Sequence, residues 1–312
     1  MNILLQNRSL AMAERIYDSR IAAGEELLKR KDDFAERVCP VCGYQHGEDY
    51  QVFGYDMRVC GRCKTDYLHW CPKPEELASY YNDPRISELN RQLWSRDRGK
   101  EFGAKMAALA SVVSKESKIV ELGCGPGQFI KYLNDTGYAH AVGVEVDREA
   151  CVLGQESGVD VRCLDVSSDT LPPADVYLLY EVIEHVFEPG DMVKNIFENL
   201  QSGGRLIVTT PNADGADNVL VPPEQPARFM ASAVFPPYHI NAFSVKSLFH
   251  FALTIGFRVI SIKTPGSLDL AMIRLHTALG DDNLSDDLSE KIQKIIALSG
   301  GSGHLEAILE KP

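Results

Sequence analysis

The chain has 312 residues, of which 45% are hydrophobic and 24% are charged, a composition typical of a soluble globular protein. Its formal net charge of −12 argues against nucleic acid or an anionic membrane as the main partner, because both attract a positive surface. No apolar run reaches the roughly 18–20 residues of a membrane span, and the N-terminus lacks the apolar core and cleavage site of a secretory signal, so we expect a cytoplasmic protein.

The first third of the chain changes character twice. Residues 1–36 carry apolar side chains at roughly helical spacing, which predicts a helical extension that could pair with a second copy of the chain as a homodimer. Residues 37–73 are rich in Cys, Gly and Tyr, and residues 74–115 again favour helices, with a break near Asn82. We therefore expect a small domain between two helical segments, ahead of a main domain over residues 116–312.

Four of the eight cysteines fall in two pairs. Cys39 and Cys42 form one C-x₂-C turn, Cys60 and Cys63 form another, and 17 residues separate the pairs. Zinc takes four thiolates in a tetrahedron, so this spacing predicts a structural zinc ribbon. Residues 37–72 have four basic and four acidic side chains, and this balance favours a folded plug or a protein contact over nucleic-acid binding. In a cytoplasmic chain we expect all eight cysteines to be reduced.

From residue 118 onward, short β-prone segments alternate with helical ones. The expected strands include KIVEL, AVGVEV, VDVRCLDV, DVYLLYEV and RLIVTTP. Strands that alternate with helices form a parallel sheet covered by helices on both faces, so we predict an α/β fold of the doubly wound, Rossmann-like kind.

A glycine-rich turn follows the first of these strands. Gly123, Gly125 and Gly127 lie between a strand and a helix, where a doubly wound sheet binds its ligand beyond the strand ends. Glycine there permits positive φ and lets ligand atoms approach the backbone. The spacing is G-x-G-x-G, and Glu121 stands two residues before the first glycine. A carboxylate there would repel the pyrophosphate of a dinucleotide but suits the cationic α-amino group of S-adenosylmethionine (SAM).

The ends of the next three strands supply further candidate cofactor contacts. Glu145 closes the second strand and is placed to accept both ribose hydroxyls. Asp165 follows the third strand and, with the backbone of Val166, is placed to contact adenine. Tyr180 closes the fourth strand at the same crevice, because the carboxyl ends of parallel strands meet at one edge of the sheet.

A series of motifs resembles the class I SAM-dependent methyltransferase family over residues 115–312: ELGCGPG, GVEVD, LDV, YEVIEHV and GGRLIVTTPN. The resemblance implies a Rossmann-like, seven-stranded methyltransferase sheet, SAM as the methyl donor and a methyltransferase activity. A nicotinamide dehydrogenase and a catalytically inactive relative remain as alternatives.

The segment after the fourth strand carries the residue types of a catalytic site. It contains Glu181, Glu184 and His185, and His239 lies in the loop after the fifth strand. This E-x-x-E-H pattern with a later His resembles the ubiquinone-biosynthesis O-methyltransferases and the small-RNA 3′-end 2′-O-methyltransferases. There the two Glu and two His can hold a divalent cation such as Mg²⁺, which acidifies the acceptor hydroxyl. Two alternatives stay open: His185 or His239 as a base without metal, and a structural role for both histidines. In each case we expect Glu181 to border the methyl group.

A zinc ribbon ahead of this methyltransferase type resembles bacterial sugar methyltransferases, which act on nucleotide-linked sugars or surface glycans. The segment ending in Tyr238 and His239 stands where the carbon-methylating branch carries an adjacent Glu-His-His, so we favour transfer to a hydroxyl of a small polar acceptor. The rivals are a carbon-methylating sugar enzyme, an RNA 2′-O-methyltransferase, a non-catalytic scaffold, and an enzyme for an aromatic or quinone acceptor, which predicts an apolar pocket built by residues 219–238.

Overall fold

The computed structural model describes residues 10–95, 98–216, 233–265 and 286–312, and the chain divides into two compact units. The ribbon unit contains Met1–Leu89, Thr210–His250 and Ile262–Glu306. The sheet unit contains Asn90–Thr209, Phe251–Ser261 and Ala307–Pro312. Within the described ranges, no helix combines the length and the apolar composition that a membrane crossing requires.

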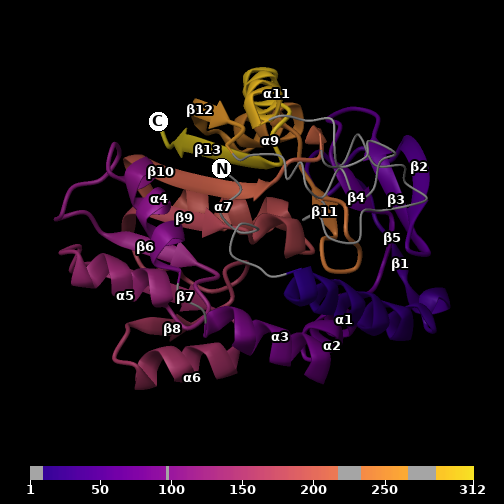
Figure 1. Cartoon of the computed structure of the whole chain (residues 1–312), viewed down its shortest axis with the longest axis horizontal. Coiled ribbons are helices and arrows are strands. Elements are labelled where there is room, and N and C mark those ends of the chain that lie inside the picture. The colour runs from indigo at the N-terminus through magenta and orange to yellow at the C-terminus, as the bar shows by residue number, and fades with distance from the viewer. Residues whose placement is uncertain (1–9, 96–97, 217–232, 266–285) are drawn as a thin grey trace. The chain divides into compact units, whose positions relative to one another are not determined.

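Seven strands form the larger sheet, in the order β12-β13-β10-β9-β6-β7-β8 (Figure 1). They are β6 (Ile119–Leu122), β7 (Ala141–Glu145), β8 (Val161–Cys163), β9 (Ala174–Tyr180), β10 (Leu200–Pro211), β12 (Arg258–Lys263) and β13 (His304–Glu310). The neighbours from β8 to β10 all pair in parallel. This sheet confirms the predicted Rossmann-like fold. The chain proceeds outward in both directions from β6, so β6 lies at the topological switch point where such sheets bind ligands.

One of the helices that accompany these strands begins at a side-chain cap. The helices are α3 (Pro84–Trp94), α4 (Gly99–Leu109), α5 (Gln128–Asp135), α6 (Arg148–Glu156), α7 (Pro189–Asn199) and α9 (Val245–Ile255). Asp147 caps α6, because its carboxylate accepts hydrogen bonds from the backbone N–H groups of Glu149 at 2.8 Å and Ala150 at 3.4 Å. A cap of this kind contributes about 1 kcal/mol to helix stability.

One apolar cluster packs β6 against α5, the two elements on either side of the glycine turn. Ile119 of β6 and Ile130 and Leu133 of α5 are fully buried in it. Burying one such side chain contributes roughly 1.5–3 kcal/mol. The strand before the turn and the helix after it are therefore held against each other, and the turn between them has little freedom.

The ribbon unit contains a four-stranded antiparallel sheet of order β11-β4-β3-β2. Its strands are β2 (Gly47–Val52), β3 (Tyr55–Cys60), β4 (Asp66–Leu68) and β11 (Asn241–Ala242). The strand β11 comes from the segment after β10, yet it pairs with β4, with Asn241 opposite Tyr67. The segment that contains His239 therefore folds together with the cysteine-rich region.

The predicted N-terminal helix ends earlier than expected. The remaining elements are α1 (Leu10–Leu28), a short 3-10 helix η1 (Lys31–Asp33), β1 (Ala35–Glu36), β5 (Trp70–Cys71), α2 (Pro74–Tyr81) and α11 (Asp286–Leu298). The expectation of helix up to residue 36 is wrong at its end, because β1 pairs antiparallel with β5.

The expectation that all cysteines are reduced is also wrong for one pair. Cys151 of α6 and Cys163 of β8 form a disulfide, with their Cα atoms 5.8 Å apart. Helix α6 packs on β8, the strand that follows it in the chain. This packing brings the two thiols together, although they are 12 residues apart in sequence. The other six cysteines form no disulfide.

Candidate cofactor site and cysteine cluster

The glycine turn lies between β6 and α5. Gly123, Gly125 and Gly127 have φ of +71°, +55° and +72°, a left-handed conformation that glycine adopts without strain. Gly127 is also the N-cap of α5, and a Cβ there would lie 2.8 Å from side-chain atoms of both Val159 and Val161. The turn therefore requires glycine for its conformation and, at Gly127, also for space.

Glu121 lies on β6 with 5% of its surface exposed. Its Oε1 lies 4.0 Å from Nζ of Lys105, and no hydrogen-bond donor among the described residues reaches its Oε2. Burial raises the pKa of Glu121 to about 7, although the nearby Lys105 opposes the shift. Buried polar atoms in native proteins nearly always have a partner. A buried carboxylate oxygen that no described donor reaches therefore fits a cationic group of a ligand.

Lys105 of α4 is a residue of this site that the sequence reasoning missed. Its Nζ lies 3.7 Å from Glu101, 4.0 Å from Glu121 and 4.3 Å from the ring centre of Tyr180. Burial lowers the pKa of Lys105, while the two carboxylates oppose that shift. Arg98 donates to Glu101 at 2.9 Å, so α4 brings two cations and one anion to β6. The one sequence signal is the four-residue spacing of Glu101 and Lys105, which is also common on solvated helices.

Glu145 closes β7 beside the glycine turn. Its Oε2 accepts a hydrogen bond from the backbone N–H of Gly125 at 2.8 Å. Its Oε1 accepts from the N–H groups of Val146 at 2.8 Å and Asp147 at 3.0 Å. Three backbone donors therefore fix this carboxylate, and about one of its roughly four acceptor sites is left for a hydroxyl group. The structure brings Glu145 and Gly125 together, and the contact with ribose stays a prediction.

Asp165 and Val166 follow β8 in a turn with its own hydrogen bonds. Asp165 is exposed, its Oδ1 accepts from the N–H of Ser167 at 2.8 Å, and its own N–H donates to Asp169 at 2.8 Å. The carbonyl of Val166 accepts from Nδ2 of Asn195 on α7 at 2.8 Å. These bonds fix the turn at the carboxyl end of β8, and its contact with adenine stays a prediction.

Glu181 has a left-handed backbone, with φ of +57°, directly after Tyr180. This conformation costs a residue other than glycine about 1–3 kcal/mol, and such strain collects at functional sites. The N–H of Glu181 donates to the carbonyl of Thr209 at 2.9 Å, and its Oε1 accepts from the Thr209 hydroxyl at 2.8 Å. Thr209 on β10 thus holds both the backbone and the carboxylate of Glu181.

The other residues predicted for catalysis fall in different units. Glu184 and His185 lie in a short helix, η2 (Ile183–His185), where Oε1 of the buried Glu184 is 3.8 Å from Nε2 of His185. His239 is 6% exposed and belongs to the ribbon unit. Three members of the predicted cation site are thus in the loop after β9, and the four-residue site stays a prediction.

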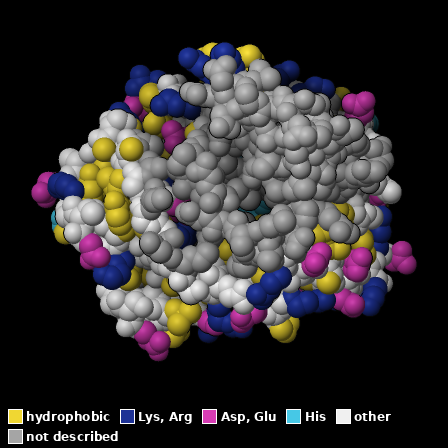
Figure 2. All heavy atoms as spheres, in the orientation of Figure 1, with side chains coloured by type: hydrophobic (Ala, Val, Ile, Leu, Met, Phe, Trp, Pro, Cys, Tyr) yellow, Lys and Arg dark blue, Asp and Glu magenta, His cyan; other side chains and the backbone are white. Residues whose placement is uncertain are grey.

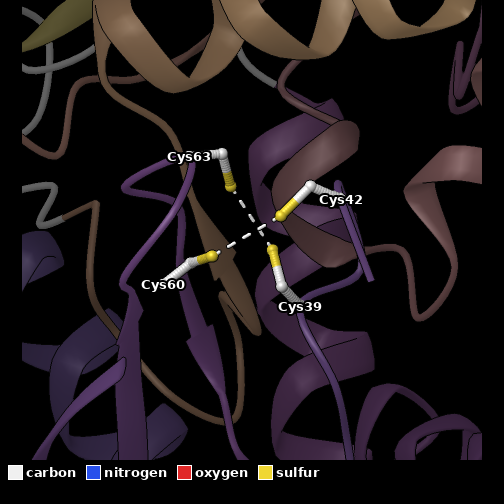
Figure 3. Close-up of side chains that lie close together, drawn as sticks. All are labelled: Cys39, Cys42, Cys60 and Cys63. Carbon is white, nitrogen blue, oxygen red and sulfur yellow. Dashed lines mark hydrogen bonds between the residues drawn. The ribbon is translucent and has the colours of Figure 1, made fainter. Parts of the chain in front are cut away.

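The four cysteines predicted to bind zinc converge at one point in the ribbon unit (Figure 3). The Sγ atoms of Cys39 and Cys63 are 3.4 Å apart, those of Cys42 and Cys60 are 3.6 Å apart, and all four lie within 4.8 Å of one another. A tetrahedral zinc ion with bonds of about 2.3 Å places its sulfurs about 3.8 Å apart. The cluster therefore has the donor set and nearly the spacing of a zinc site.

The cluster thiols are hydrogen-bonded in two pairs. The hydrogen bond with Cys63 raises the pKa of Cys39, and burial raises the pKa of Cys42 to about 11. The same hydrogen bond between Cys39 and Cys63 lowers the pKa of Cys63 to about 4. Zinc binds thiolates, so an ion here would displace the thiol protons.

Residues 91–262, more than half of the chain, match the family model described as a methyltransferase domain. The chain belongs to this methyltransferase domain family. Its membership confirms the family resemblance of the sequence motifs. The chain is 28% identical over 149 residues to a "probable S-adenosylmethionine-dependent methyltransferase" of Mycolicibacterium smegmatis, a match that covers 45% of this chain and 52% of that protein.

A second relative of the methyltransferase domain is the ubiquinone biosynthesis O-methyltransferase of Caulobacter vibrioides. It is 27% identical over 154 residues, which cover 46% of this chain and 58% of that protein. The chain thus spans little more than half the length of these curated relatives.

The fold of the methyltransferase domain also occurs in solved structures. The plantazolicin methyltransferase BamL aligns with a TM-score of 0.52 and 12% identity, covering 76% of this chain and 94% of that one. The [4+2]-cyclase SpnF aligns with a TM-score of 0.52 and 16% identity, covering 78% and 98%. Identities this low show the fold alone, and one fold serves two different reactions. The activity must therefore be argued from the residues of the site.

Proposed function

We propose that this chain is a SAM-dependent methyltransferase. The supporting observation is the end of β6, where the buried Glu121 has an oxygen that no donor among the described residues reaches, next to three left-handed glycines. SAM carries two cationic groups, an ammonium and a sulfonium, which a buried carboxylate attracts. The pyrophosphate of a dinucleotide would be repelled there. Glu145 would accept the ribose hydroxyls, and Asp165 with Val166 would contact adenine.

Lys105 completes the recognition of the methionine end of SAM. That end is a zwitterion, so its site needs a cation for the carboxylate beside an anion for the ammonium. Nζ of Lys105 lies 4.0 Å from Glu121 and can supply that cation. The formal charges of Arg98, Glu101, Lys105 and Glu121 sum to zero, which suits a zwitterion without net charge.

We propose a hydroxyl group as the methyl acceptor. SAM supplies an activated methyl group, and its transfer is an in-line displacement that depends mainly on positioning. The hydroxyl proton passes to His185 or His239 as general base, and Glu181 borders the reacting groups. A divalent cation on Glu181, Glu184, His185 and His239 is the alternative way to acidify the hydroxyl.

For the acceptor we propose a small polar molecule, a sugar or a nucleotide-linked sugar or glycan. The net charge of −12 and the balanced charge of residues 37–72 disfavour a polyanion such as RNA. On the described part of the face in Figure 2, acidic and basic side chains are interspersed. The apolar pocket that an aromatic or quinone acceptor predicts at residues 219–238 lies mostly outside the described residues.

The second candidate is methyl transfer to a phenolic hydroxyl. Its support is the resemblance to the ubiquinone biosynthesis O-methyltransferase of Caulobacter vibrioides. The E-x-x-E-H segment with Glu181, Glu184 and His185 fits either acceptor, because sugars and phenols both need a deprotonated oxygen.

A screen of methyl transfer tests both candidates. The chain is incubated with SAM and a panel of nucleotide sugars, polyphenols and RNA, and products are identified by mass spectrometry. A methylated nucleotide sugar supports the first candidate, whereas a methylated polyphenol or RNA replaces it. No binding of S-adenosylhomocysteine (SAH) by calorimetry would overturn the methyltransferase proposal itself.

Two histidine variants and a chelator then separate the mechanisms. With the acceptor found, H185A and H239A should keep SAH affinity, and loss of methyl transfer in one of them identifies the base. Activity that survives EDTA in a protein holding one zinc ion and no second metal would exclude the divalent-cation mechanism.

We also propose a structural zinc ion on Cys39, Cys42, Cys60 and Cys63. The support is the convergence of four thiols within 4.8 Å in a small antiparallel sheet. Small domains of this kind gain much of their stability from a metal, because their apolar core is limited.

A further inference from the structure

We propose that Trp94, the last residue of α3, is a contact residue for the bound cofactor. Its indole would pack on SAM where the cofactor crosses the glycine turn. This inference rests on the proposed SAM site, and it adds a residue that the motif pattern does not contain.

The indole of Trp94 lies over the middle glycine of the turn. A Cβ on Gly125 would be 3.1 Å from Nε1 of Trp94, 3.6 Å from its Cδ1 and 3.7 Å from its Cε2. Gly125 is also the residue whose N–H donates to Glu145, the proposed ribose ligand, at 2.8 Å. A cofactor on this turn, with its ribose at Glu145, therefore passes next to the indole.

Two tethers hold the end of α3 at this place. The side-chain amide of Gln128, the first residue of α5, donates to the carbonyl of Trp94. Arg91, one turn before Trp94, pairs with Glu149 in the first turn of α6 at 3.1 Å. The end of α3 is thus fastened to the N-termini of the two helices that follow β6 and β7. The end of α3 from Asn90 onward lies in the sheet unit, as do β6, α5, β7 and α6.

The chemistry of the indole suits this cofactor. A half-buried tryptophan presents an apolar ring and one N–H donor. The ring attracts a cation such as the sulfonium, and its apolar face keeps water away from the methyl group. A tryptophan that only packed against the turn would not distinguish SAM, with its positive sulfur, from SAH, whose sulfur is neutral.

Intrinsic fluorescence tests the proposal directly, because the chain has two tryptophans. The other one, Trp70, lies on β5 in the ribbon unit, is 41% exposed and serves as the control. We expect SAH to change the emission of the wild type and of W70F equally, and to leave the emission of W94F unchanged. Calorimetry should show W94A binding SAH roughly three- to tenfold more weakly than W70F does, with a larger loss for SAM.

The outcomes separate this inference from the proposed function. The role of Trp94 would be overturned if the wild type binds SAH and the emission change persists in W94F. It would also be overturned if W94A and W70F bind SAH equally well. Either result would leave the SAM site intact. A wild type that binds neither SAM nor SAH would overturn the proposed function itself. W94F, which keeps an aromatic ring, should retain the thermal unfolding midpoint of the wild type, so a loss of signal in it reports the missing indole.

Discussion

Replacing Glu121 with glutamine keeps the shape of the side chain and removes its charge. In the protein without cofactor, burial raises the pKa of this carboxyl from its ordinary 4.5 to about 7. The folded protein therefore holds the proton more tightly than the unfolded chain does. The contribution of Glu121 to stability is complete below pH 4.5 and is lost as the pH rises to about 7.

The size of this effect follows from the shift. A pKa raised from 4.5 to about 7 corresponds to about 3 kcal/mol, a value that already contains the opposing effect of Lys105. E121Q without cofactor should therefore be more stable than the wild type by about 1–3 kcal/mol at pH 8, and nearly equal to it at pH 4.5. Urea unfolding at both pH values measures the difference, and in that difference the other titrating groups cancel.

The same substitution should weaken cofactor binding. A hydrogen bond to a charged group contributes about 1.5–3 kcal/mol, so E121Q should bind SAH about 10- to 100-fold more weakly. Wild-type affinity should fall as the pH drops below about 7, because the protonated carboxyl attracts an ammonium less, and E121Q should lack this dependence.

The matched control is E116Q, which removes an exposed glutamate shortly before β6. E116Q should have the same free energy of unfolding as the wild type at both pH values, and it should bind SAH with the same affinity. The reasoning would be refuted by an E121Q protein that binds SAH as tightly as the wild type. A stability difference that does not vary with pH would show that burial does not raise the pKa of Glu121.

Three further predictions follow from other parts of the chain. Metal analysis should find one zinc ion per chain, which C60S loses and C71S keeps, because Cys71 lies outside the cluster; zinc retained in C60S would refute the four-thiol site. C163S, at an exposed position, should lower the free energy of unfolding by roughly 3 kcal/mol under oxidising conditions and not under reducing ones, since only the disulfide is removed. If C163S and the wild type unfold alike in the oxidising buffer as well, that result would count against the disulfide. G125A should lose SAH affinity, because its Cβ meets Trp94 at 3.1 Å and its φ is +55°, whereas G103A in open space should bind as the wild type does; calorimetry compares the two.

Much of the sheet and both candidate sites can be predicted from local pattern. The alternation of strands and helices gives the sheet, the paired cysteines give the cluster, and the glycines from Gly123 to Gly127 between a strand and a helix give the turn. Each of these features depends on residues close together in sequence, so a single stretch of chain carries the whole signal.

Contacts between distant segments leave no such local signal. Lys105 is separated from the strand of Glu121 by the last turn of α4 and a loop, and nothing in the residues around it shows that its ammonium lies beside a buried carboxylate. The pairing of Asn241 with Tyr67 joins segments more than 170 residues apart. The disulfide of Cys151 with Cys163 depends on how α6 packs on β8. In each case tertiary packing, not sequence spacing, decides which groups meet.

The residues proposed for the cofactor and for the base do not all belong to one unit. Glu121, Glu145 and the glycine turn belong to the sheet unit, whereas His239 belongs to the ribbon unit with the cysteine cluster. The backbone next to His239 is bonded to the ribbon's own sheet, since the N–H of Leu68 donates to the carbonyl of Ile240 at 2.9 Å.

Several side chains of the ribbon unit hold the same segment. The hydroxyl of Tyr81 donates to the carbonyl of Tyr238 at 2.8 Å, and the guanidinium of Arg37 donates to Asn241 at 3.3 Å. A metal that stabilises β3 and β4 would therefore also fix the position of His239, through β11. If His239 is the base, loss of zinc should reduce methyl transfer while SAH binding persists, because the residues proposed to hold the cofactor lie in the unit without the cluster.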